Sequence, residues 1–194
     1  DRLGAEVEVL WVRAKVFDRL APSVTPQPML ALLGRPEAEI PSHLGPDDVV
    51  LVLVGVSDPG NVGTLIRVAD AVAAGCVVVI AGADPWGAKA VRSSTGSVMR
   101  VPVVQSESAA AALGALRGAG AAVVAGDAAR GVAYDSGVIR GPVAIVLGSE
   151  AHGLGRDLNS LVDTWVRIDM PGRAESLNVA MAGTLLAFEA RRRT

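Results

Sequence analysis

The sequence predicts an α/β fold with a mostly parallel sheet, and three observations support this prediction. From Val49 onward, short runs of β-branched residues alternate with alanine-rich segments, which is typical of strands joined by crossover helices. The 194 residues are 51% hydrophobic and 20% charged, a composition that favours one sizeable core over a disordered chain. Every apolar stretch is shorter than the roughly 18 to 20 residues of a membrane span, so no membrane association is expected.

Six strands and five helices are expected in this region. The strands are the apolar, β-branched runs at residues 49–56, 76–81, 101–104, 121–125, 142–147 and 165–168. The helices are the alanine-rich or periodic segments between and after them, at residues 62–74, 88–99, 106–117, 156–162 and 176–193. In the first helix Leu65, Ile66 and Ala69 share one face, whereas Arg67 and Asp70 fall outside that apolar stripe.

The residues before Val49 have a different composition. Residues 1–33 combine an apolar segment with a charged stretch and are expected to belong to a small separate domain. Residues 34–46 contain three prolines and two glycines, which is typical of an extended linker. We therefore expect the main domain at residues 47–194. The chain opens on Asp1 rather than Met, so it is expected to be a processed chain or a piece of a longer one.

Charge and residue content exclude several classes of protein. The formal net charge is −2, so any contact with RNA must be local and shaped, because a strongly basic surface is ruled out. Cys76 is the single cysteine, and His43 and His152 have no metal-ligand spacing, so neither a disulfide framework nor a metal site is expected. With no apparent signal peptide, these features favour a cytoplasmic protein. The P-loop, the G-x-G-x-x-G fingerprint and the G-x-S-x-G elbow are also missing from the sequence.

Glycine and polar residues gather directly after three of the predicted strands. Asn61 and Arg67 follow the first strand, and we expect Asn61 to cap the helix that starts at residue 62. Three glycines in eight residues follow the strand at 142–147, where they allow the backbone to approach a ligand closely. Taken singly, each group has a simple structural explanation: Arg67 as a solvated helix arginine, Glu150 as a surface acid and Ser176 as a helix cap.

Together and in this order, the three groups resemble the motifs of the SpoU (TrmH) family of RNA 2'-O-ribose methyltransferases, in the SPOUT superfamily. The matching segments are Asn61-x-Gly63-x-x-x-Arg67, Gly148-Ser149-Glu150-x-x-Gly153-Leu154 and Ile168-x-Met170-x-Gly172-x-x-x-Ser176-Leu177-Asn178-Val179. The resemblance covers residues 47 to about 190. Residues 1–33 look like the tail of the L30e-like α/β substrate-binding domain that precedes many of these catalytic domains, with its front half missing.

The resemblance implies a C-terminal deep trefoil knot, an S-adenosylmethionine cofactor and a homodimer with its active site at the subunit interface. By their positions in the motifs, the implied cofactor-binding residues are Leu147, Gly148, Ile168, Met170 and Leu177. The implied catalytic residues are Arg67, Glu150, Ser176 and Asn178, with Arg67 acting near the other subunit's cofactor. Asn61, Arg67, Arg92 and Arg173 are expected to contact RNA, and Arg100 and the run at 191–193 are further candidates for phosphate contacts.

The third motif departs from the family pattern at one point. The family usually has Ile-Pro-Met, whereas this chain places Asp169 between Ile168 and Met170 and its proline at Pro171. Pro171 biases Met170 toward an extended conformation, so the loop can keep its shape by another route. A carboxylate beside a sulfonium is electrostatically tolerable, yet it can also alter the packing of adenine. Cofactor affinity is therefore the property that we expect this change to affect.

Three classes of function stay open on the sequence. The first is methyl transfer to a ribose 2'-hydroxyl of RNA; the L30e-like remnant favours ribosomal RNA of the 23S type, with transfer RNA as the alternative. The second is a dimeric RNA-binding module without catalysis, which Asp169 makes conceivable, and the third is a small-molecule α/β enzyme. In the first class, Arg67 acts as a general base or, as we prefer, holds the adjacent phosphate and lowers the pKa of the hydroxyl, because arginine stays protonated at neutral pH.

Overall fold

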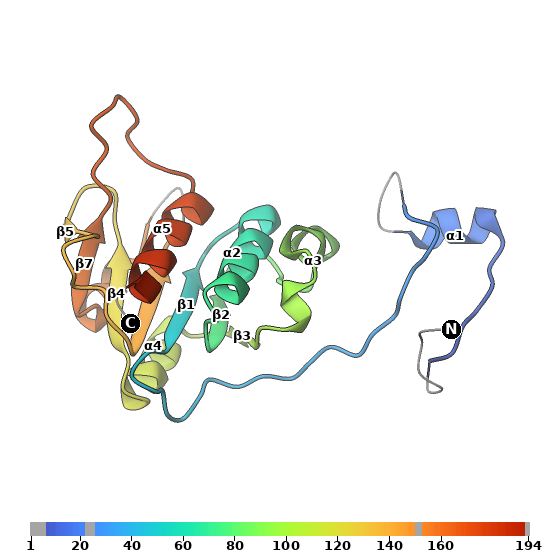
Figure 1. The fold of residues 1–194 in the computed structure, drawn as a ribbon, viewed down its shortest axis with the longest axis horizontal. Helices are drawn as coiled ribbons and strands as arrows, with labels where there is room; N and C mark the ends of the chain where they lie inside the picture. Colours follow the sequence, from blue (N-terminus) through green and yellow to red (C-terminus); the bar gives the residue numbers. More distant parts are fainter. Residues whose placement is uncertain (1–6, 22–25, 150–152, 193–194) are drawn as a thin grey trace. The chain divides into compact units, whose positions relative to one another are not determined.

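The computed structural model describes residues 7–21, 26–149 and 153–192 (Figure 1). The chain divides into two compact units, Asp1–Arg35 and Pro36–Thr194. The first unit contains α1 (Ala14–Leu20), none of whose residues is buried. Within the described ranges, no helix is both long enough and apolar enough to cross a membrane. The sheet and all three motifs lie in the second unit.

The described part of the second unit contains a sheet of seven strands in the order β3-β2-β1-β6-β4-β7-β5. Each pair of neighbouring strands is parallel, so the predicted parallel α/β fold is confirmed. The strands are β1 (Val49–Val54), β2 (Cys76–Ile80), β3 (Val103–Ser106), β4 (Ala122–Gly126), β5 (Val132–Ala133), β6 (Val143–Leu147) and β7 (Thr164–Arg167). Of these, β5 was not expected, because two residues are too few to give a recognisable strand pattern.

The helices differ from the expected ones at their ends. They are α2 (Pro59–Ala71), α3 (Ala88–Ser94), α4 (Ala109–Gly118) and α5 (Val179–Arg192), with the 3-10 helices η1 (Ser97–Met99) and η2 (Arg156–Leu161). The single helix expected at 88–99 is wrong, because Thr95 and Gly96 adopt φ angles of 52° and 84° and end α3 before η1. The segment expected to be helical at 156–162 is the 3-10 helix η2, and the last helix begins at Val179 instead of residue 176.

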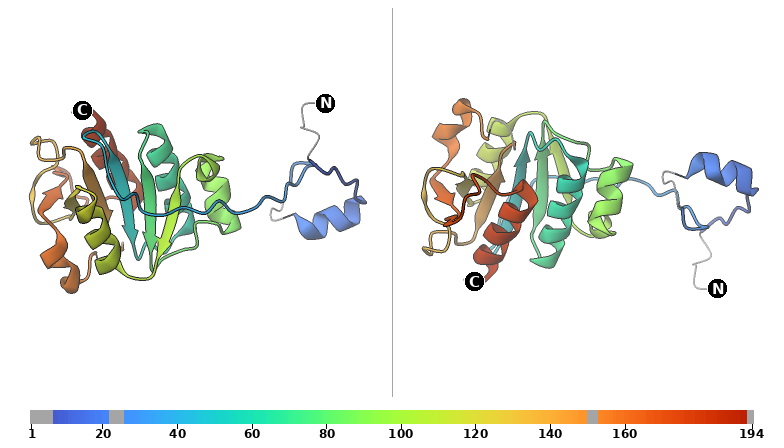
Figure 2. Two further views of the ribbon diagram at one scale, coloured as in Figure 1. Left: turned by 90° about the horizontal axis from the view of Figure 1, so that it is seen from below. Right: turned by 90° about the horizontal axis from the view of Figure 1, so that it is seen from above.

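The helices cover both faces of the sheet, as Figure 2 shows from two sides. On one face, alternate residues such as Leu51 pack in a core cluster with Leu65 of α2 and Leu186 of α5. On the other face, Val52 belongs to a second cluster that includes Leu113 of α4. Because the central strands β1, β2 and β6 are buried on both faces, they read in the sequence as continuous apolar runs without alternation.

Two helical glycines let α2 pack closely against its neighbours. A Cβ atom at Gly63 would overlap the backbone oxygen of Ala90 in α3. A Cβ atom at Gly183 in α5 would lie 2.5 Å from Leu65 Cδ2 of α2 and 2.5 Å from Leu147 Cδ1 of β6. The glycine of the first motif therefore has a packing role, and α2 is fixed between α3 and α5.

Residues 36–48 belong to the second unit and precede β1. Leu44 is buried in the α4-side cluster, and its backbone N–H donates to the carbonyl of Ala119 at 3.0 Å. Ala38 and Ile40 pack against the same cluster and are partly buried. Part of the segment expected as a linker is thus an ordered edge of the main domain.

The last part of the chain crosses back over the sheet. Strand β7 pairs with β4 and β5, at the end of the sheet away from β2 and β3. The following helix α5 nevertheless packs on β6, β1 and α2 (Figure 1). The connection at residues 168–178 therefore runs from β7 to the region above β6 and β1, and brings the third motif to the other two.

Candidate functional site

The three motifs meet at one edge of the sheet. Because all strands are parallel, the segments that follow β1, β6, β4 and β7 leave the sheet at the same carboxyl edge. A side-chain hydrogen bond joins two of these segments: Asn178 Nδ2 donates to Asn61 Oδ1 at 3.1 Å, across 117 positions of sequence. The structure thus brings the first and third motifs into direct contact.

Asp58, and not Asn61, caps the helix that carries the first motif. The Asp58 carboxylate accepts from the backbone N–H of Gly60 at 2.5 Å and of Asn61 at 3.3 Å. Pro59 occupies the first helical position, where its fixed φ favours the helix and no N–H is lost. The predicted Asn61 cap is wrong because the Asp-Pro pair starts the helix three residues earlier, which leaves the Asn61 side chain available for Asn178.

Lys89 of α3 holds the Asp58 carboxylate in place. Its Nζ lies 3.0 Å from Asp58 Oδ2. The hydrogen bond from Lys89, followed by that from the Gly60 N–H, holds the pKa of Asp58 below its usual value. The cap therefore stays charged at neutral pH, where a negative charge at a helix N-terminus is favourable.

Asn178 stands at the cap position of α5 instead of in its first turn. Its Oδ1 accepts from the backbone N–H of Ala180 at 2.9 Å and of Met181 at 3.4 Å. With Nδ2 bonded to Asn61, the second amide hydrogen of Asn178 has no partner among the described residues and can serve a ligand. Ser176, the other candidate cap, lies exposed in the preceding loop.

The loop after β6 is closed on itself by backbone contacts. The N–H of Ser149 donates to the carbonyl of Gly153 at 3.2 Å, and the Gly153 N–H donates back at 2.8 Å. A Cβ atom at Gly148 would lie 2.7 Å from the Leu154 nitrogen and overlap the backbone of Gly153. Gly153 itself has a φ of 62°, which glycine adopts without strain. Glu150 and His152 lie outside the described residues.

Of the remaining candidates for cofactor binding, one lies in the core and three lie nearer the surface. Leu147 is 3% exposed and packs against α5, so only its backbone can reach a ligand at the sheet edge. Ile168 and Met170 are partly buried, and Leu177 is 37% exposed. These three side chains give the connection between β7 and α5 a partly open apolar surface.

Asp169, the departure from the family pattern, is paired with a neighbouring arginine. Arg167 Nε lies 2.8 Å from Asp169 Oδ1, and Arg167 Nη1 also donates to the backbone oxygen of Gly131. Arg167 therefore balances the added charge and ties the third motif to the loop that follows β4. Nothing in the sequence pattern alone pointed to the contact between Arg167 and Gly131, because it depends on β5 and β7 being neighbours.

The loop after β4 was missed as part of the site. Asp127 forms its turn by accepting from the backbone N–H of Ala129 at 2.9 Å and of Arg130 at 3.1 Å. Burial acts to raise the pKa of Asp127, but these hydrogen bonds outweigh it and hold the pKa below its usual value. The Arg130 guanidinium lies 3.5 Å from the ring centre of Trp165. Gly126 and Asp127 directly follow a predicted strand, so the rule used for the other three strands would have found this loop.

Arg67 lies away from the cofactor candidates. It is exposed on α2, eight residues after Pro59 and therefore about 12 Å along the helix. It lines a hollow of about 340 Å³ together with Asp70, Ala71, Thr95, Ser97 and Arg100, and no expected cofactor residue borders that hollow. None of the described side chains forms a hydrogen bond or ion pair with Arg67. The other predicted RNA contacts, Arg92 and Arg173, are exposed but do not line this hollow.

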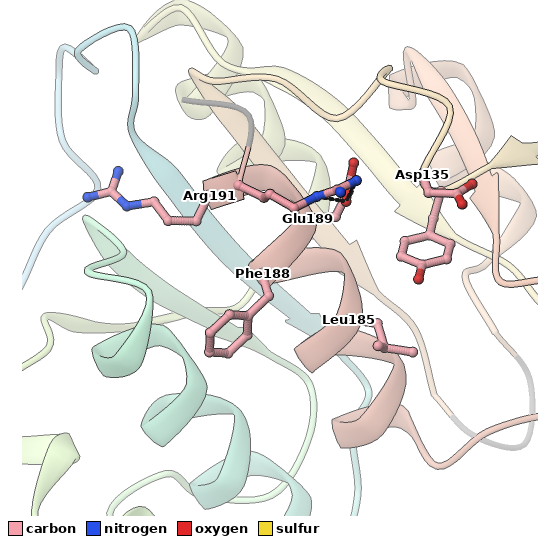
Figure 3. A pocket seen from close by; sticks show the side chains of 7 residues that line it. Asp135, Leu185, Phe188, Glu189 and Arg191 are labelled. Atoms are coloured by element: carbon pink, nitrogen blue, oxygen red, sulfur yellow. Dashed lines mark hydrogen bonds and ion pairs between the residues drawn. The ribbon is translucent and has the colours of Figure 1, made fainter.

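A larger hollow, of about 590 Å³, lies beside the C-terminal half of α5 (Figure 3). Leu185 and Phe188 project from the helix, and Glu189 accepts an ion pair from Arg192 at 2.8 Å. Tyr134 and Asp135 form its other wall. None of the expected cofactor or catalytic residues lines it, and half-exposed Phe188 is more typical of a protein contact than of a cofactor site.

Known proteins are similar to this chain in sequence and in fold. The chain is 32% identical over 190 residues to the 23S rRNA (guanosine(2553)-2'-O)-methyltransferase RlmP of Bacillus subtilis, covering 97% of this chain and 75% of RlmP. It superposes with a TM-score of 0.82 on a putative TrmH-family RNA methyltransferase of Porphyromonas gingivalis, 32% identical, over 92% of this chain and 71% of the other. An AdoMet-bound rRNA methyltransferase of Sinorhizobium meliloti gives a TM-score of 0.73 at 36% identity, with 77% and 58% covered.

The family model for the SpoU rRNA methylase family matches residues 48–188, which include all three motifs and the whole sheet. The resemblance of residues 47 to about 190 to this family is thereby confirmed, and the chain belongs to the SpoU rRNA methylase family.

Proposed function

We propose that this protein transfers a methyl group from S-adenosylmethionine to a ribose 2'-hydroxyl of RNA, with 23S ribosomal RNA as the preferred substrate. Membership of a methylase family and the named activity of RlmP support this proposal. The structural observation that carries it is the hydrogen bond from Asn178 to Asn61, which joins two motifs at the sheet edge where the Gly148 loop also begins. A cytoplasmic location and transfer RNA as an alternative substrate stay predictions.

The residues at the carboxyl edge fit S-adenosylmethionine. The partly open apolar side chains of Ile168, Met170 and Leu177 suit the flat face of an adenine. The close packing of Gly148 on Gly153 keeps side chains out of the strand end and leaves backbone groups to face a ligand. When bound, the cofactor would supply a methyl group on a sulfonium. The methyl-transfer geometry requires the hydroxyl oxygen, the methyl carbon and the sulfur to be in line, and positioning of this kind contributes up to about 7 to 11 kcal/mol.

Arg67 is the proposed activating group for the ribose hydroxyl. We assign it the electrostatic role, in which its guanidinium binds the phosphate beside the target ribose and stabilises the oxygen as it loses its proton. The hydroxyl proton passes to water, because a guanidinium group has N–H donors only and no atom that can accept a proton. Ser176 and the remaining amide hydrogen of Asn178 are the proposed contacts that orient the ribose.

We propose that Arg67 completes the active site of a second subunit. Within one chain, the hollow that Arg67 lines contains none of the cofactor candidates, which supports an arrangement across an interface. Helix α5 offers a surface for it: Met181 is 62% exposed, Leu185 39% and Phe188 51%, at the spacing of one helix face. An apolar stripe of this kind on a soluble domain is typical of a protein interface.

The knot and the N-terminal unit belong to the same proposal. A deep trefoil knot is consistent with residues 168–178 crossing from β7 back to the face of β6 and β1, past the Gly148 loop. For the first unit, the alignment with RlmP covers 97% of the chain, so residues before Pro36 have a counterpart in RlmP. We propose that this unit is part of an L30e-like RNA-binding domain.

Transfer of a labelled methyl group tests the activity directly. The chain is incubated with methyl-tritiated S-adenosylmethionine and either unmodified 23S rRNA or unmodified tRNA, and the labelled nucleoside is then identified after nuclease digestion. We expect label in a 2'-O-methylated nucleoside of the 23S rRNA. Label in tRNA alone would mean that the protein is a tRNA methyltransferase. RNA binding without any label would mean that it is an RNA-binding module without catalytic activity.

A further inference from the structure

The hollow around Arg67 brings together two arginines from different elements. Arg67 belongs to α2 and Arg100 directly follows η1, and both line the same hollow of about 340 Å³ with Asp70, Thr95 and Ser97. Arg67 and Asp70 are three positions apart on α2, so their side chains lie on the same face of the helix. The surroundings of Arg67 therefore include a second guanidinium and a carboxylate.

Arg100 is held in one orientation by this carboxylate. Its Nε and Nη2 donate to Asp70 Oδ2 at 2.9 and 2.6 Å, and Nη2 also donates to Ser97 Oγ at 3.1 Å. Ser97 is 2% exposed and donates to the same Asp70 oxygen at 2.7 Å. The hydrogen bonds from Arg100 and then Ser97 hold the pKa of Asp70 below its usual value, so the carboxylate is charged at neutral pH.

Arg100 still has donors to offer. Of the five N–H donors of a guanidinium, three point to Asp70 and Ser97, and the two on Nη1 have no partner among the described residues. The side chain is 59% exposed, so these donors are accessible from solvent. An oriented guanidinium with accessible N–H groups matches the geometry of phosphate oxygens.

The charges in the hollow favour an anion. Two guanidinium groups against one carboxylate leave one positive charge at this place, on a chain whose net charge is −2. A local positive site on an otherwise acidic protein is what a shaped contact with a polyanion requires. Phosphate contacts position a nucleic acid without reading its sequence.

We propose that this hollow binds a phosphodiester group of the RNA substrate, with Arg67 and Arg100 as its cationic contacts and Asp70 and Ser97 as positioning residues for Arg100. The inference rests on the proposed function, since it takes RNA as the ligand, and it adds a defined phosphate site to it. Asp70 is negatively charged, yet it favours binding of the phosphate because it orients Arg100.

The test measures binding of in vitro transcribed 23S rRNA to the full chain by filter retention, at several salt concentrations. Arg100→Ala should weaken binding by about tenfold, as expected for one charged contact. The slope of log affinity against log salt should become shallower by about one, because one fewer counterion is released. Equal affinity and an equal slope for Arg100→Ala and the unaltered chain would overturn the proposal.

Arg117→Ala is the matched control. Arg117 is also an exposed arginine paired with one aspartate, with Nη2 at 2.6 Å from Asp163 Oδ1, but it lies on α4 at the opposite face of the sheet. We expect this variant to bind RNA as the unaltered chain does. A loss equal to that of Arg100→Ala would mean that any exposed arginine contributes, and would remove the assignment of this hollow.

Asp70→Ala distinguishes positioning from simple charge. If Asp70 acted only as a negative charge near RNA, its removal would strengthen binding, whereas loss of the orientation of Arg100 weakens it. We expect weaker RNA binding, by about threefold to tenfold, and a lower melting temperature, because the buried Ser97 hydroxyl loses its acceptor. Asp70→Asn, which keeps one acceptor for Arg100, replaces it if the alanine variant does not fold and should give a smaller loss. Stronger binding in the folded variant would refute the positioning role.

The outcome also separates this inference from the proposed function. Binding of 23S rRNA that depends on Arg100, without transfer of label, would retain the phosphate site and refute the methyltransferase. Transfer of label with no effect of Arg100 on binding would do the reverse. Absence of any RNA binding by the unaltered chain would refute both.

Discussion

Helix α2 and the connection at residues 168–178 hold the two sides of the proposed site in different ways. On α2, Arg67 stands on a regular helix that is capped by Asp58 and packed on α3 through Gly63. The connection has no regular structure, and its residues 171–178 are exposed. It is attached through the Arg167–Asp169 ion pair at one end and through the Asn178–Asn61 hydrogen bond at the other. On α2, the Arg67 side chain can therefore be changed without altering the backbone. In the connection, a change of side chain is also expected to change the conformation of the backbone.

The strongest test of this difference is Gly148→Val, which adds a side chain where the loop after β6 touches itself. The valine would overlap the backbone of Gly153 and Leu154, so the loop has to move. We expect S-adenosylmethionine affinity, measured by calorimetry, to fall by more than about 100-fold, with a lower melting temperature. Gly114→Val is the control, since a Cβ atom at Gly114 on α4 meets nothing within 4 Å and should change the affinity little. Unchanged affinity in Gly148→Val would place the cofactor elsewhere.

Arg67→Ala tests the helix side. Arg67 is exposed and no described side chain is bonded to it, so stability and cofactor affinity should stay unchanged. Turnover with saturating cofactor should fall by about 100-fold, as for the loss of one electrostatic contact in a transition state. Single-turnover methyl transfer to 23S rRNA measures this. Turnover equal to that of the unaltered chain would remove Arg67 from the mechanism.

Mixing the two variants shows whether Arg67 works across the interface. In a dimer of one Arg67→Ala subunit and one Gly148→Val subunit, the intact arginine of the second can serve the intact cofactor loop of the first. Random mixing should therefore restore about a quarter of the normal activity, since half of the dimers regain one of two sites. No recovery on mixing would mean that Arg67 and the cofactor loop of the same chain work together.

The hydrogen bond between Asn61 and Asn178 joins α2 to the connection at residues 168–178. Its contribution should be measurable in the free energy of unfolding. Asn178→Ala removes the cap of α5 and should cost about 1 kcal/mol in the free energy of unfolding, with Asn61→Ala costing about half as much. A double-mutant cycle by urea denaturation should give a coupling of about 0.5 kcal/mol, close to the whole cost of Asn61→Ala. A coupling of zero would mean that the hydrogen bond does not hold the first and third motifs together.

The sequence predicts those parts of the site that depend on local pattern. The strands, the parallel sheet and the three motif segments follow from apolar runs and from residues that stand together in the chain. Strand order does not follow from such patterns, because it depends on contacts between distant segments. The pairing of β5 with β7 places Arg167 beside Gly131, and no local pattern in residues 131–167 indicates it.

Caps and glycines show a second limit. Asn61 is a good cap residue by type, yet Asp58 and Pro59 together start the helix earlier and release Asn61 for a partner 117 positions away. Gly63 belongs to the first motif, yet in the structure its role is to let α2 pack against Ala90 of α3. A sequence motif shows which residues occur together in a family. It does not distinguish residues that bind a ligand from glycines that let two helices pack closely.

The smallest effect is expected at Asp169, where the chain departs from its family. Its carboxylate is already balanced by Arg167 at 2.8 Å, and both side chains are well exposed, so the pair contributes at most about 1 kcal/mol to stability. Asp169→Asn should therefore change S-adenosylmethionine affinity by less than about threefold. Arg167→Ala should lower it more, because it frees the Gly131 backbone as well as the acid. If Asp169→Asn instead changed the affinity by tenfold while Arg167→Ala left it unchanged, the carboxylate would be facing the cofactor, and the connection would be shaped by the ligand rather than by this ion pair.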